Sequence, residues 1–552
     1  MLYQKLILLS AIPLASASVW RRAQASSFAG STTTFEFPPA NVTATIPDPI
    51  FPEASQVGFA GPTPTGDEAI AIATAPVLSK VDSAFPLVRP DTSDRKGKRF
   101  NVLKYWGNLS PMFSVDSAEF GLPGASEVVP EGCALTQVHL LHRHGARYPT
   151  SGSSPSQFAA KLHCAAVGAG FKATGPLEFL ARWTFKLGAE ILTPFGREQL
   201  YNLGVGFRVK YGDLLKGSND LPVFRTTSQE RMVDSALQFS AGFFGVQQYQ
   251  ASYHQLIEIE ENGFNSTLAP YYQCPNAINN IAAFGNIQAG KWAAIYAAPT
   301  VKRLSKYIKG VNLTTTDIVA MQSTCAYETV ALGYSAFCNL FTEEEWKAYE
   351  YFNDLLFWYS YGPGNPAVAA QGIGWVQELI SRLTKTRITT FDTSVNGTVV
   401  SSNISFPLDQ PIFVDATHDT VISAIATAMN LTSLSANGPL PTDHIPKNQT
   451  WIVPNIAPFA SRLVGQVLSC AASDTPTHIR FVLNDGVVPL TGILGCEADK
   501  DGLCALDAFV SGVRARIDEV DYQFDCFAEY AVPDPDRIVD GRYPPALRNS
   551  TA

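Results

Sequence analysis

Two histidines and two arginines lie close together in the stretch LLHRHGARYPT, residues 140–150. Gathering imidazole and guanidinium groups in a folded chain costs electrostatic energy unless an anion binds among them. A guanidinium group presents a planar fork of donors that matches a tetrahedral oxyanion two oxygens at a time. Arg143 and Arg147 therefore indicate an anion site.

Two later segments could complete such a site. Arg225 stands just ahead of a predicted helix, where backbone N–H groups and the helix dipole favour an anion. His418 and Asp419 follow a short apolar run, 412–414, and precede apolar residues at helical spacing. Such strand-to-helix junctions hold the ligand sites of open α/β sheets. Three arginines around one point suit a phosphoryl group better than a carboxylate, so we expect a phosphoryl group.

The residue types favour phosphoryl chemistry without a metal or a cofactor. The sequence has no glycine-rich phosphate loop with lysine and Ser/Thr, and no obvious carboxylate cluster for two metals. An imidazole can instead attack phosphorus to form a phosphohistidine, and neighbouring guanidinium charges lower the pKa of that imidazole. We expect Asp419, which would face an anionic substrate, to have a raised pKa and to protonate the leaving alkoxide. His418 and the arginines would stabilise the charge of the transferring group.

A metal site is the alternative for the histidines. His142 and His144 lie two residues apart, so on a continuing strand they would share a face and could bind a metal together with His418. The three arginines would repel a cation, so we expect no metal here. Arg231 could be a second anion contact, but we expect it to be exposed or ion-paired. We expect His139 to be a satisfied core residue.

Hydrophobic periodicity predicts the elements that position these residues. The apolar run 138–141 is typical of a buried strand, and Gly145 permits the φ angle that a sharp turn needs. Thr227 and Glu230 have the spacing of a capping box at the start of a helix. Near the other end, Asp485-Gly486 between two β-rich runs predicts a hairpin. The fold class expected is therefore α/β.

The catalytic region is expected over residues 101–552, with a mostly α-helical insertion at about 155–400. Strand patterns at both ends of this region, with helical patterns between them, predict one sheet domain that carries a helical domain. The net charge of −9 and the pI near 5.5 argue against a nucleic-acid partner, which would require a basic surface.

The first hundred residues have a different character. Residues 1–18 have a lysine, an apolar core and Ala-Ser-Ala at 15–17, the layout of a secretory signal peptide. No later apolar run reaches the length of a membrane span. Residues 19–100 form a leader rich in Ser, Thr and Pro, and Lys98-Arg99 is a dibasic pair at which the chain could be processed. We therefore expect a protein that is secreted, extracellular or associated with the cell wall.

Sequons and cysteines agree with export. Nine cysteines are present without a Cys-X-X-Cys pair, so we expect disulfides with one cysteine left over. Nine Asn-X-Ser/Thr sequons are candidates for glycosylation. They are Asn41, Asn108, Asn265, Asn312, Asn396, Asn403, Asn430, Asn448 and Asn549.

The motifs resemble those of a known family. RHGARYP, residues 143–149, resembles the Arg-His-Gly-X-Arg-X-Pro signature of the histidine acid phosphatases, and His418-Asp419 resembles their downstream His-Asp pair. The stretches YWGNLSPMF (105–113), LTPFGREQL (192–200) and FRTTSQERMVDSA (224–236) are similar to the fungal phytase branch. The likeness covers roughly residues 101–530.

The resemblance implies a role for each residue of the site. His144 would be the nucleophile and Asp419 the proton donor. The residues that would bind the substrate phosphate are Arg143, Arg147, Arg225 and His418. The implied fold is a phosphoglycerate-mutase-like α/β sandwich with an inserted, mostly α-helical domain. The implied disulfides are Cys133–Cys470, Cys274–Cys526, Cys325–Cys338 and Cys496–Cys504, which leaves Cys164 as a buried thiol.

The implied substrates are small phosphate monoesters, including phytate (myo-inositol hexakisphosphate). One departure favours a broader acid phosphatase, because the stretch after the motif, TSGSSPSQFAAK, has its first lysine only at Lys161. Phytate-specific members tend to carry lysines there. A mutase of the same fold and a non-catalytic, glycosylated surface protein are further alternatives, but export argues against the first and the complete set of site residues argues against the second.

Overall fold

The computed structural model describes residues 25–27, 29–32, 100–218, 220–471, 473 and 475–548. The predicted signal peptide, most of the leader, Lys98-Arg99 and the sequons at Asn41 and Asn549 lie outside the described residues. Among the described residues, no helix is both long enough and apolar enough to cross a membrane.

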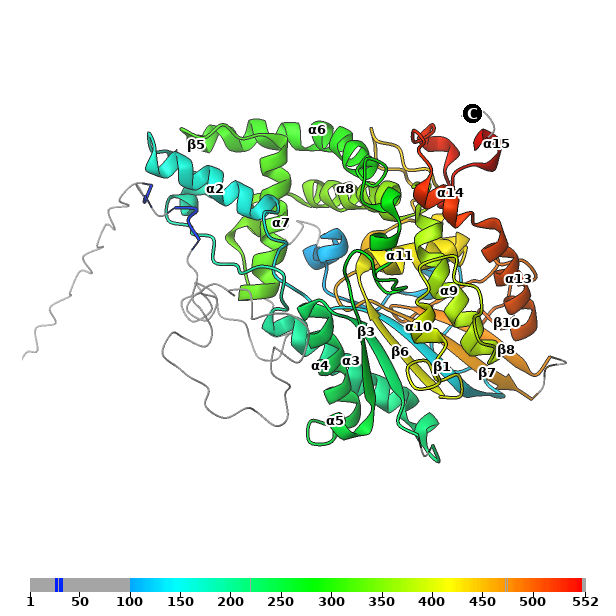
Figure 1. Cartoon of the computed structure of the whole chain (residues 1–552). Helices are drawn as coiled ribbons and strands as arrows, with labels where there is room; N and C mark the ends of the chain where they lie inside the picture. Colours follow the sequence, from blue (N-terminus) through cyan, green and yellow to red (C-terminus); the bar gives the residue numbers. More distant parts are fainter. Residues whose placement is uncertain are drawn as a thin grey trace, which may run out of the picture.

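A mixed sheet of eight strands forms the centre of the molecule (Figure 1), with the order β10-β8-β7-β1-β6-β3-β4 and β9 paired to β8. Its strands are β1 (Cys133–Arg143), β3 (Val223–Thr227), β4 (His254–Glu258), β6 (Ile412–Thr417), β7 (Arg462–Cys470), β8 (Thr477–Leu483), β9 (Gly486–Val488) and β10 (Cys504–Ala505). Two short strands, β2 (Lys172–Ala173) and β5 (Ile308–Lys309), pair with each other elsewhere.

Half of the sheet is parallel, and this half positions the candidate site. β6 runs parallel to β1, and β3 runs parallel to both β6 and β4. Parallel strands end at the same edge, so the residues that follow β1, β3, β4 and β6 come together there. The other strands are antiparallel, and β8 and β9 form the hairpin predicted around Asp485-Gly486.

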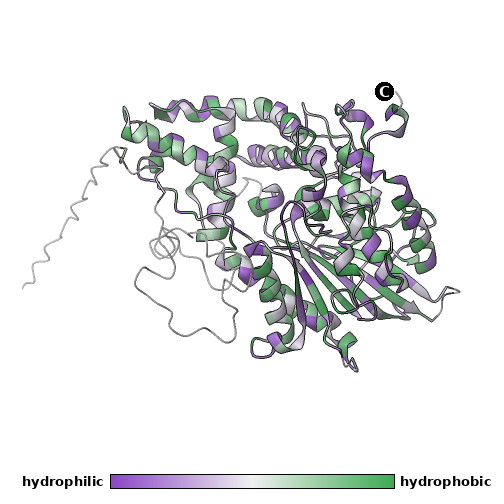
Figure 2. Cartoon of the chain, in the orientation of Figure 1, coloured by the Kyte–Doolittle hydropathy of each residue, from purple (hydrophilic) through white to green (hydrophobic). Residues whose placement is uncertain are grey.

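Helices cover both faces of the sheet, each over its own core. Val138 and Leu140 of β1 pack with residues of α3 (Pro194–Tyr211) and α4 (Glu230–Phe244). Leu141, which points to the other face, belongs to the core that includes α9 (Val368–Thr384), α11 (Asp419–Ala428) and α13 (Leu506–Glu519). Hydrophobic residues accordingly dominate the central strands in Figure 2. This burial on both faces explains the nearly continuous apolar run of β1.

A helical part lies beside the sheet and includes α2 (Ser154–Val167), α6 (Phe284–Leu304), α7 (Thr315–Leu332) and α8 (Glu343–Tyr361) (Figure 1). The predicted insertion at 155–400 is not one helical block, because β3 and β4 fall inside that interval and join the sheet. β3 was not predicted from the sequence, because its five residues, VFRTT, are buried on both faces and show no alternation of apolar and polar residues.

The remaining elements are short. The α-helices are α5 (Tyr249–Ser252), α10 (Gly397–Val400), α12 (Val453–Ile456), α14 (Tyr522–Phe527) and α15 (Pro545–Arg548). The 3₁₀ helices are η2 (Val102–Lys104), η3 (Gly107–Leu109), η4 (Ser117–Phe120), η5 (Gly175–Ala181), η6 (Gly212–Leu215), η7 (Pro270–Gln273), η8 (Pro275–Ala277), η9 (Ser305–Tyr307), η10 (Ala336–Leu340), η11 (Thr432–Ser435) and η12 (Pro535–Arg537).

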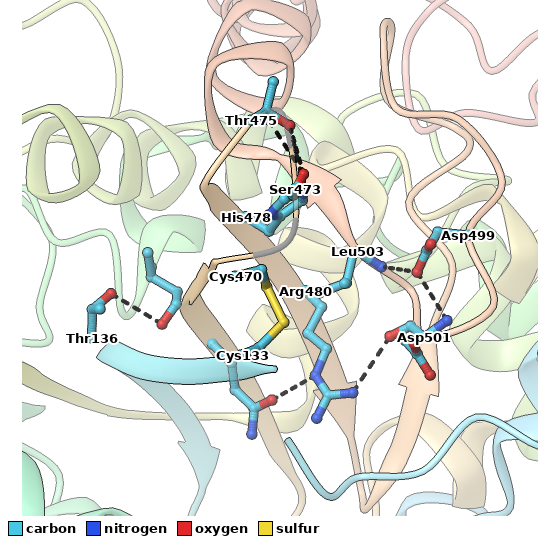
Figure 3. The surroundings of a disulfide bond; sticks show 12 residues. Cys133, Thr136, Cys470, Ser473, Thr475, His478, Arg480, Asp499, Asp501 and Leu503 are labelled. Atoms are coloured by element: carbon cyan, nitrogen blue, oxygen red, sulfur yellow. Dashed lines mark hydrogen bonds between the residues drawn. A yellow bond between two sulfur atoms is a disulfide. The ribbon is translucent and has the colours of Figure 1, made fainter. Parts of the chain in front are cut away.

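Four disulfides join elements that are distant in sequence or stabilise local loops. They pair Cys133 with Cys470, Cys274 with Cys526, Cys325 with Cys338, and Cys496 with Cys504, as the resemblance implied. Cys133 and Cys470 face each other across β1 and β7 (Figure 3), and the nearby Arg480 donates to the backbone oxygen of Asp501. The prediction that Cys164 is buried is wrong, because α2 presents its thiol to solvent.

A short piece of the leader packs against the folded body. The backbone N–H groups of Ser26 and Gly30 donate to the carbonyls of Ala181 and Trp183, at 2.8 and 2.7 Å. The N–H of Phe185 donates in turn to the carbonyl of Ser31, at 2.9 Å. Residues of this piece therefore extend the body by strand-like pairing, which the composition of the leader did not predict.

Candidate active site

The predicted motifs meet at the carboxyl edge of the parallel strands. His144 follows β1 directly, and His418 and Asp419 follow β6 at the start of α11. The His144 N–H donates to the carbonyl of Thr417, the last residue of β6, at 3.2 Å. The rings of His144 and His418 have their centroids 5.6 Å apart. The fold therefore brings together two of the three predicted segments in the expected way.

The loop that carries the motif after β1, residues 144–149 (the motif loop), packs against the first turn of α3. A Cβ at Gly145 would lie 2.1 Å from the carbonyl oxygen of Gly196, and one at Gly196 would lie 1.9 Å from that of Ala146. The N–H of Ala146 donates to the side chain of Gln199 at 2.9 Å. Gly145 is thus required for close backbone approach and not for the φ angle that the sequence argument invoked, since its φ lies outside the left-handed region.

His144 is held as a neutral imidazole with a defined tautomer. Its Nδ1 lies 2.7 Å from the carbonyl oxygen of Gly145, which can only accept, so Nδ1 carries the hydrogen. Burial holds the pKa of His144 well below its usual range, and the charges of Arg143, Arg231 and Arg147 lower it further. The lone pair therefore resides on Nε2, the atom that can attack an electrophile.

Three arginines surround this imidazole, and they are Arg143, Arg147 and Arg231. The Nε groups of all three are buried and have no hydrogen-bond acceptor among the described residues. Buried donors are costly to leave unpaired, so three such donors on arginines whose charges act on His144 indicate an anion that accepts from them. Arg231 lies in the first turn of α4. The expectation that it is ion-paired holds too, since Glu190 contacts it at 3.1 Å.

Asp419 stands beside Arg143 at the entrance to α11. Its Oδ2 lies 2.8 Å from a terminal nitrogen of Arg143 and accepts from the amide of Asn108 at 2.7 Å. Burial raises the pKa of Asp419, but Arg143 and Asn108 outweigh burial, and the net shift is downward. The prediction of a raised pKa took the negative charge of a bound substrate into account. Without a substrate, the protein groups lower the pKa of Asp419.

His418 has a partner that the sequence analysis missed. Its Nε2 lies 3.0 Å from an oxygen of Glu260, a carboxylate that also accepts from the hydroxyl of Tyr271. Glu260 is only 3% exposed and comes two residues after the end of β4. The signal available in the sequence was its place after a strand, at the edge where the other site residues gather.

Arg225 does not belong to this group, which corrects the prediction. Its side chain lies inside the sheet domain, 2% exposed. Its partners are Asp415 and Glu378, both at 2.7 Å, and Glu258 at 3.2 Å. Because Arg225 lies in the strand β3 and faces Asp415 of the neighbouring β6, it never reaches the carboxyl edge. Each of its three nitrogens donates to a carboxylate, so the negative charge around Arg225 disfavours a phosphate there.

The helix that follows also begins later than predicted. α4 starts at Glu230 with Gln229 as its N-cap, and Gln229 makes no side-chain cap, so Thr227 and Glu230 form no capping box. Thr227 is the last residue of β3. Arg231, six residues after Arg225, therefore lies in the first turn of α4, where its charge acts on His144.

The remaining predicted histidines lie in the core. His142 stacks on Phe239 with ring centroids 5.3 Å apart, so it does not share the site with His144. His139 stacks on Phe413 at 4.7 Å, and burial lowers its pKa to about 3. The metal alternative therefore lacks its His142 ligand.

Comparisons with known proteins agree with the geometry. The chain matches the model of the histidine phosphatase superfamily (branch 2) over residues 134–484. It is similar to Phytase A of Aspergillus oryzae, with 34% identity over 428 residues that cover 75% of this chain and 88% of that protein. Phytase A of Emericella nidulans is 33% identical over 467 residues, which cover 81% of this chain and 96% of that protein.

Solved structures show the same fold. The phytase from D. castellii superposes with a TM-score of 0.65 and 24% identity, covering 82% of this chain and 93% of that one. The Bifidobacterium longum multiple inositol polyphosphate phosphatase, in complex with inositol hexasulfate, gives a TM-score of 0.52 and 13% identity, covering 73% and 96%. The family model and the curated relatives confirm the resemblance seen in the motifs, and the chain belongs to branch 2 of the histidine phosphatase superfamily.

Proposed function

We propose that the protein hydrolyses phosphate monoesters, phytate included, through a phosphohistidine formed on His144. The observation that carries the proposal is the neutral His144 next to three arginines, Arg143, Arg147 and Arg231, whose buried Nε donors have no acceptor among the described residues. An anion held by these donors would present its phosphorus to the lone pair. The names of the curated relatives, Phytase A, support phytate as one substrate.

The first step transfers the phosphoryl group. Nε2 of His144 forms a bond to phosphorus while the bond from phosphorus to the ester oxygen breaks. Arg143, Arg147 and Arg231 stabilise the charge on the three other phosphate oxygens, and His418 assists them. In this assignment Arg231 takes the place that the sequence analysis gave to Arg225.

Asp419 supplies the proton that the leaving alkoxide needs. A bound phosphate brings negative charge close to this carboxyl group and engages Arg143, so it raises the pKa of Asp419 from its lowered value. The protonated Asp419 then donates to the ester oxygen as the bond breaks. In the second step water attacks the phosphohistidine, Asp419 accepts a proton from that water, and inorganic phosphate leaves.

A broad-specificity acid phosphatase remains the second candidate. Two ion pairs near the motif favour it over a phytate-specific enzyme. Lys161, the first lysine after the motif, is bound to Asp317 at 2.5 Å and is not free for a distant phosphate. Glu190 places a carboxylate beside Arg231, where it would repel a substrate with many phosphates. Both features weaken selectivity for phytate without affecting the removal of a single phosphate.

The protein is proposed to be secreted. The predicted signal peptide at 1–18, the four disulfides and the sequons support export to an oxidising compartment. Of the sequon asparagines among the described residues, Asn265, Asn312, Asn403 and Asn448 are exposed, and exposure makes them accessible to glycosylation.

The test compares phosphate release from phytate and from p-nitrophenyl phosphate at about pH 5 with EDTA present. The wild type should release phosphate from both, and His144→Ala should release none from either. The ratio of the two rates distinguishes a phytase from a general acid phosphatase. Activity that survives His144→Ala would sink the phosphohistidine route, and activity that EDTA alone abolishes would require a metal.

A further inference from the structure

We propose that Asn108 is a positioning residue for Asp419, and that this sequon is unglycosylated in the active protein. Asn108 lies in η3, far from the motifs in sequence, yet its side-chain amide donates to Oδ2 of Asp419 at 2.7 Å. The inference rests on the proposed function, because it assigns a role in protonating the leaving group.

Asn108 holds both members of the Arg143–Asp419 pair. Its backbone carbonyl accepts from a terminal nitrogen of Arg143, while its side chain contacts Asp419. The other Asp419 oxygen, Oδ1, accepts from the N–H of Thr420 at 2.9 Å. Asn108 and Arg143 therefore hold Oδ2 while Thr420 anchors Oδ1, so the carboxyl group has a fixed orientation.

The segment that carries Asn108 is rigid. Gly107 has a φ of 59°, and a Cβ there would lie 2.3 Å from the Cβ of Asn353 in α8, so η3 packs tightly against that helix. The neighbouring Ser110 is fully buried, and its hydroxyl accepts from the N–H of Trp106 at 3.1 Å. A rigid support is what a general acid needs, since small errors in placement cost much of the rate.

The same contact argues against a glycan. N-glycosylation attaches the sugar to Nδ2, the atom that donates to Asp419. A sugar at that atom would stand where the leaving group must sit. Ser110, the hydroxyl residue of this sequon, is also buried. Molecules that carry the glycan would therefore be inactive, and the active protein should carry none at Asn108.

Two variants test the positioning role. Asn108→Ala removes the amide, and Asn108→Asp keeps the shape but replaces the donor with a second carboxylate. The leaving group provides the diagnostic readout, because an alkyl phosphate requires protonation of the departing oxygen, whereas p-nitrophenolate leaves readily without it. We expect kcat/KM for glycerol phosphate to fall about ten- to hundredfold in both variants, as for the loss of a hydrogen bond to a charged group. For p-nitrophenyl phosphate the fall should be about threefold or less.

Asp419→Asn is the reference variant. Its kcat/KM for glycerol phosphate should fall further than that of the Asn108 variants, and again more than its kcat/KM for p-nitrophenyl phosphate. Inhibition by inorganic phosphate should stay close to the wild-type value in Asn108→Ala, since the arginines remain, and this verifies that the site is intact. Equal losses on both substrates, or no loss on glycerol phosphate, would overturn the positioning role. Full activity of His144→Ala would instead overturn the proposed function itself.

The glycan prediction has its own measurement. Active protein from a eukaryotic host is treated with peptide-N-glycosidase in ¹⁸O water, which converts a glycosylated asparagine into labelled aspartate. Asn108 should remain unlabelled asparagine in the peptide that contains it. Labelled aspartate at position 108 in active protein would overturn this part of the inference.

Discussion

At the scale of single residues, Arg225 and Arg231 show how burial and partners decide what an arginine does. Arg225 is enclosed by Asp415, Glu258 and Glu378, which raise its pKa well above the usual value although burial acts in the opposite direction. Arg231 is ion-paired with Glu190, the charge of Glu260 also acts on it, and its buried Nε has no acceptor among the described residues. The first arginine stabilises the fold, and the second is available to a ligand.

Replacing each arginine with methionine should separate these roles. Arg231→Met should lower kcat/KM about hundredfold, as for the loss of one donor to the transition state, with little change in thermal stability. Arg225→Met leaves carboxylates buried without their partner and should lower the free energy of unfolding by about 3–5 kcal/mol. Kinetics and thermal unfolding of both variants check this. An Arg225→Met protein with wild-type stability and a specific loss of phosphate binding would contradict the assignment.

The sequence could not distinguish the two arginines. The three carboxylates around Arg225 come from positions 258, 378 and 415, and only the sheet and α9 bring them together. The motifs located His144, Arg143, Arg147, His418 and Asp419, because these residues lie at or within a few residues of the ends of β1 and β6, which local periodicity reveals. Glu260, Glu190 and Asn108 belong to no such pattern, since their relation to the site exists only in three dimensions.

At the scale of elements, the contact between the motif loop and α3 is the tightest constraint on the site. Gly145 and Gly196 allow two backbones to touch, and the N–H of Thr193 donates to the carbonyl of Ala146 at 2.9 Å. The stretch LTPFG was therefore part of the family pattern for a structural reason, since the position of His144 depends on where α3 begins.

Gly196→Ala should displace the motif loop from α3. Its Cβ would overlap the backbone of Ala146, so we expect activity to fall by at least about tenfold together with a loss of stability. Gly206→Ala is the matched control on the same helix, because a Cβ there meets nothing within 4 Å. That control should keep its activity and gain about 0.5–1 kcal/mol in stability from helix propensity. Equal behaviour of the two variants would show that the close contact is unimportant.

Elements also show what could be predicted of the fold. β1, β6 and the β8–β9 hairpin are recognisable because apolar runs and an Asp-Gly turn are local signals. β3 and β4 were missed inside the interval 155–400, because short buried strands between helices carry no periodicity of their own. The sheet order depends on long-range pairing, which no local pattern specifies.

At the scale of the whole molecule, buried carboxyl groups favour a mildly acidic medium. Burial raises the pKa of Glu258 and of Asp525 to about 7, in each case against a nearby arginine. In α8, burial likewise raises the pKa of Glu350 and Asp354, which share a hydrogen bond. These groups lie in different parts of the structure, so their effect on stability is distributed.

Stability should therefore decrease as the pH rises. A carboxyl group whose pKa is raised by folding stabilises the native state fully below its unfolded pKa near 4, and this contribution is lost as the pH rises through about 7. Asp415 and Asp485 have lowered pKa values, so their contribution is lost in stronger acid. We expect the highest Tm near about pH 5 and a decrease of several degrees by about pH 8, measured by calorimetry.

Glu350→Gln tests whether buried carboxyl groups cause the loss of stability at higher pH. Glutamine mimics the protonated carboxyl group, can still donate to Asp354 and cannot ionise. The variant should match the wild type in acid and lose less stability towards about pH 8. A variant whose Tm falls with pH as steeply as that of the wild type would exclude Glu350 as a contributor.

The pairing of residues 26–31 with residues 181–185 determines what proteolysis of the leader would produce. No cysteine precedes Cys133, so no disulfide can tie the leader to the body. A protease that cuts between residues 32 and 100, at Lys98-Arg99 for example, would leave the upstream fragment attached without a covalent bond, by its backbone hydrogen bonds and by the buried Ala29. The product would then be a two-chain protein that migrates as one species under native conditions and separates under denaturing, non-reducing conditions.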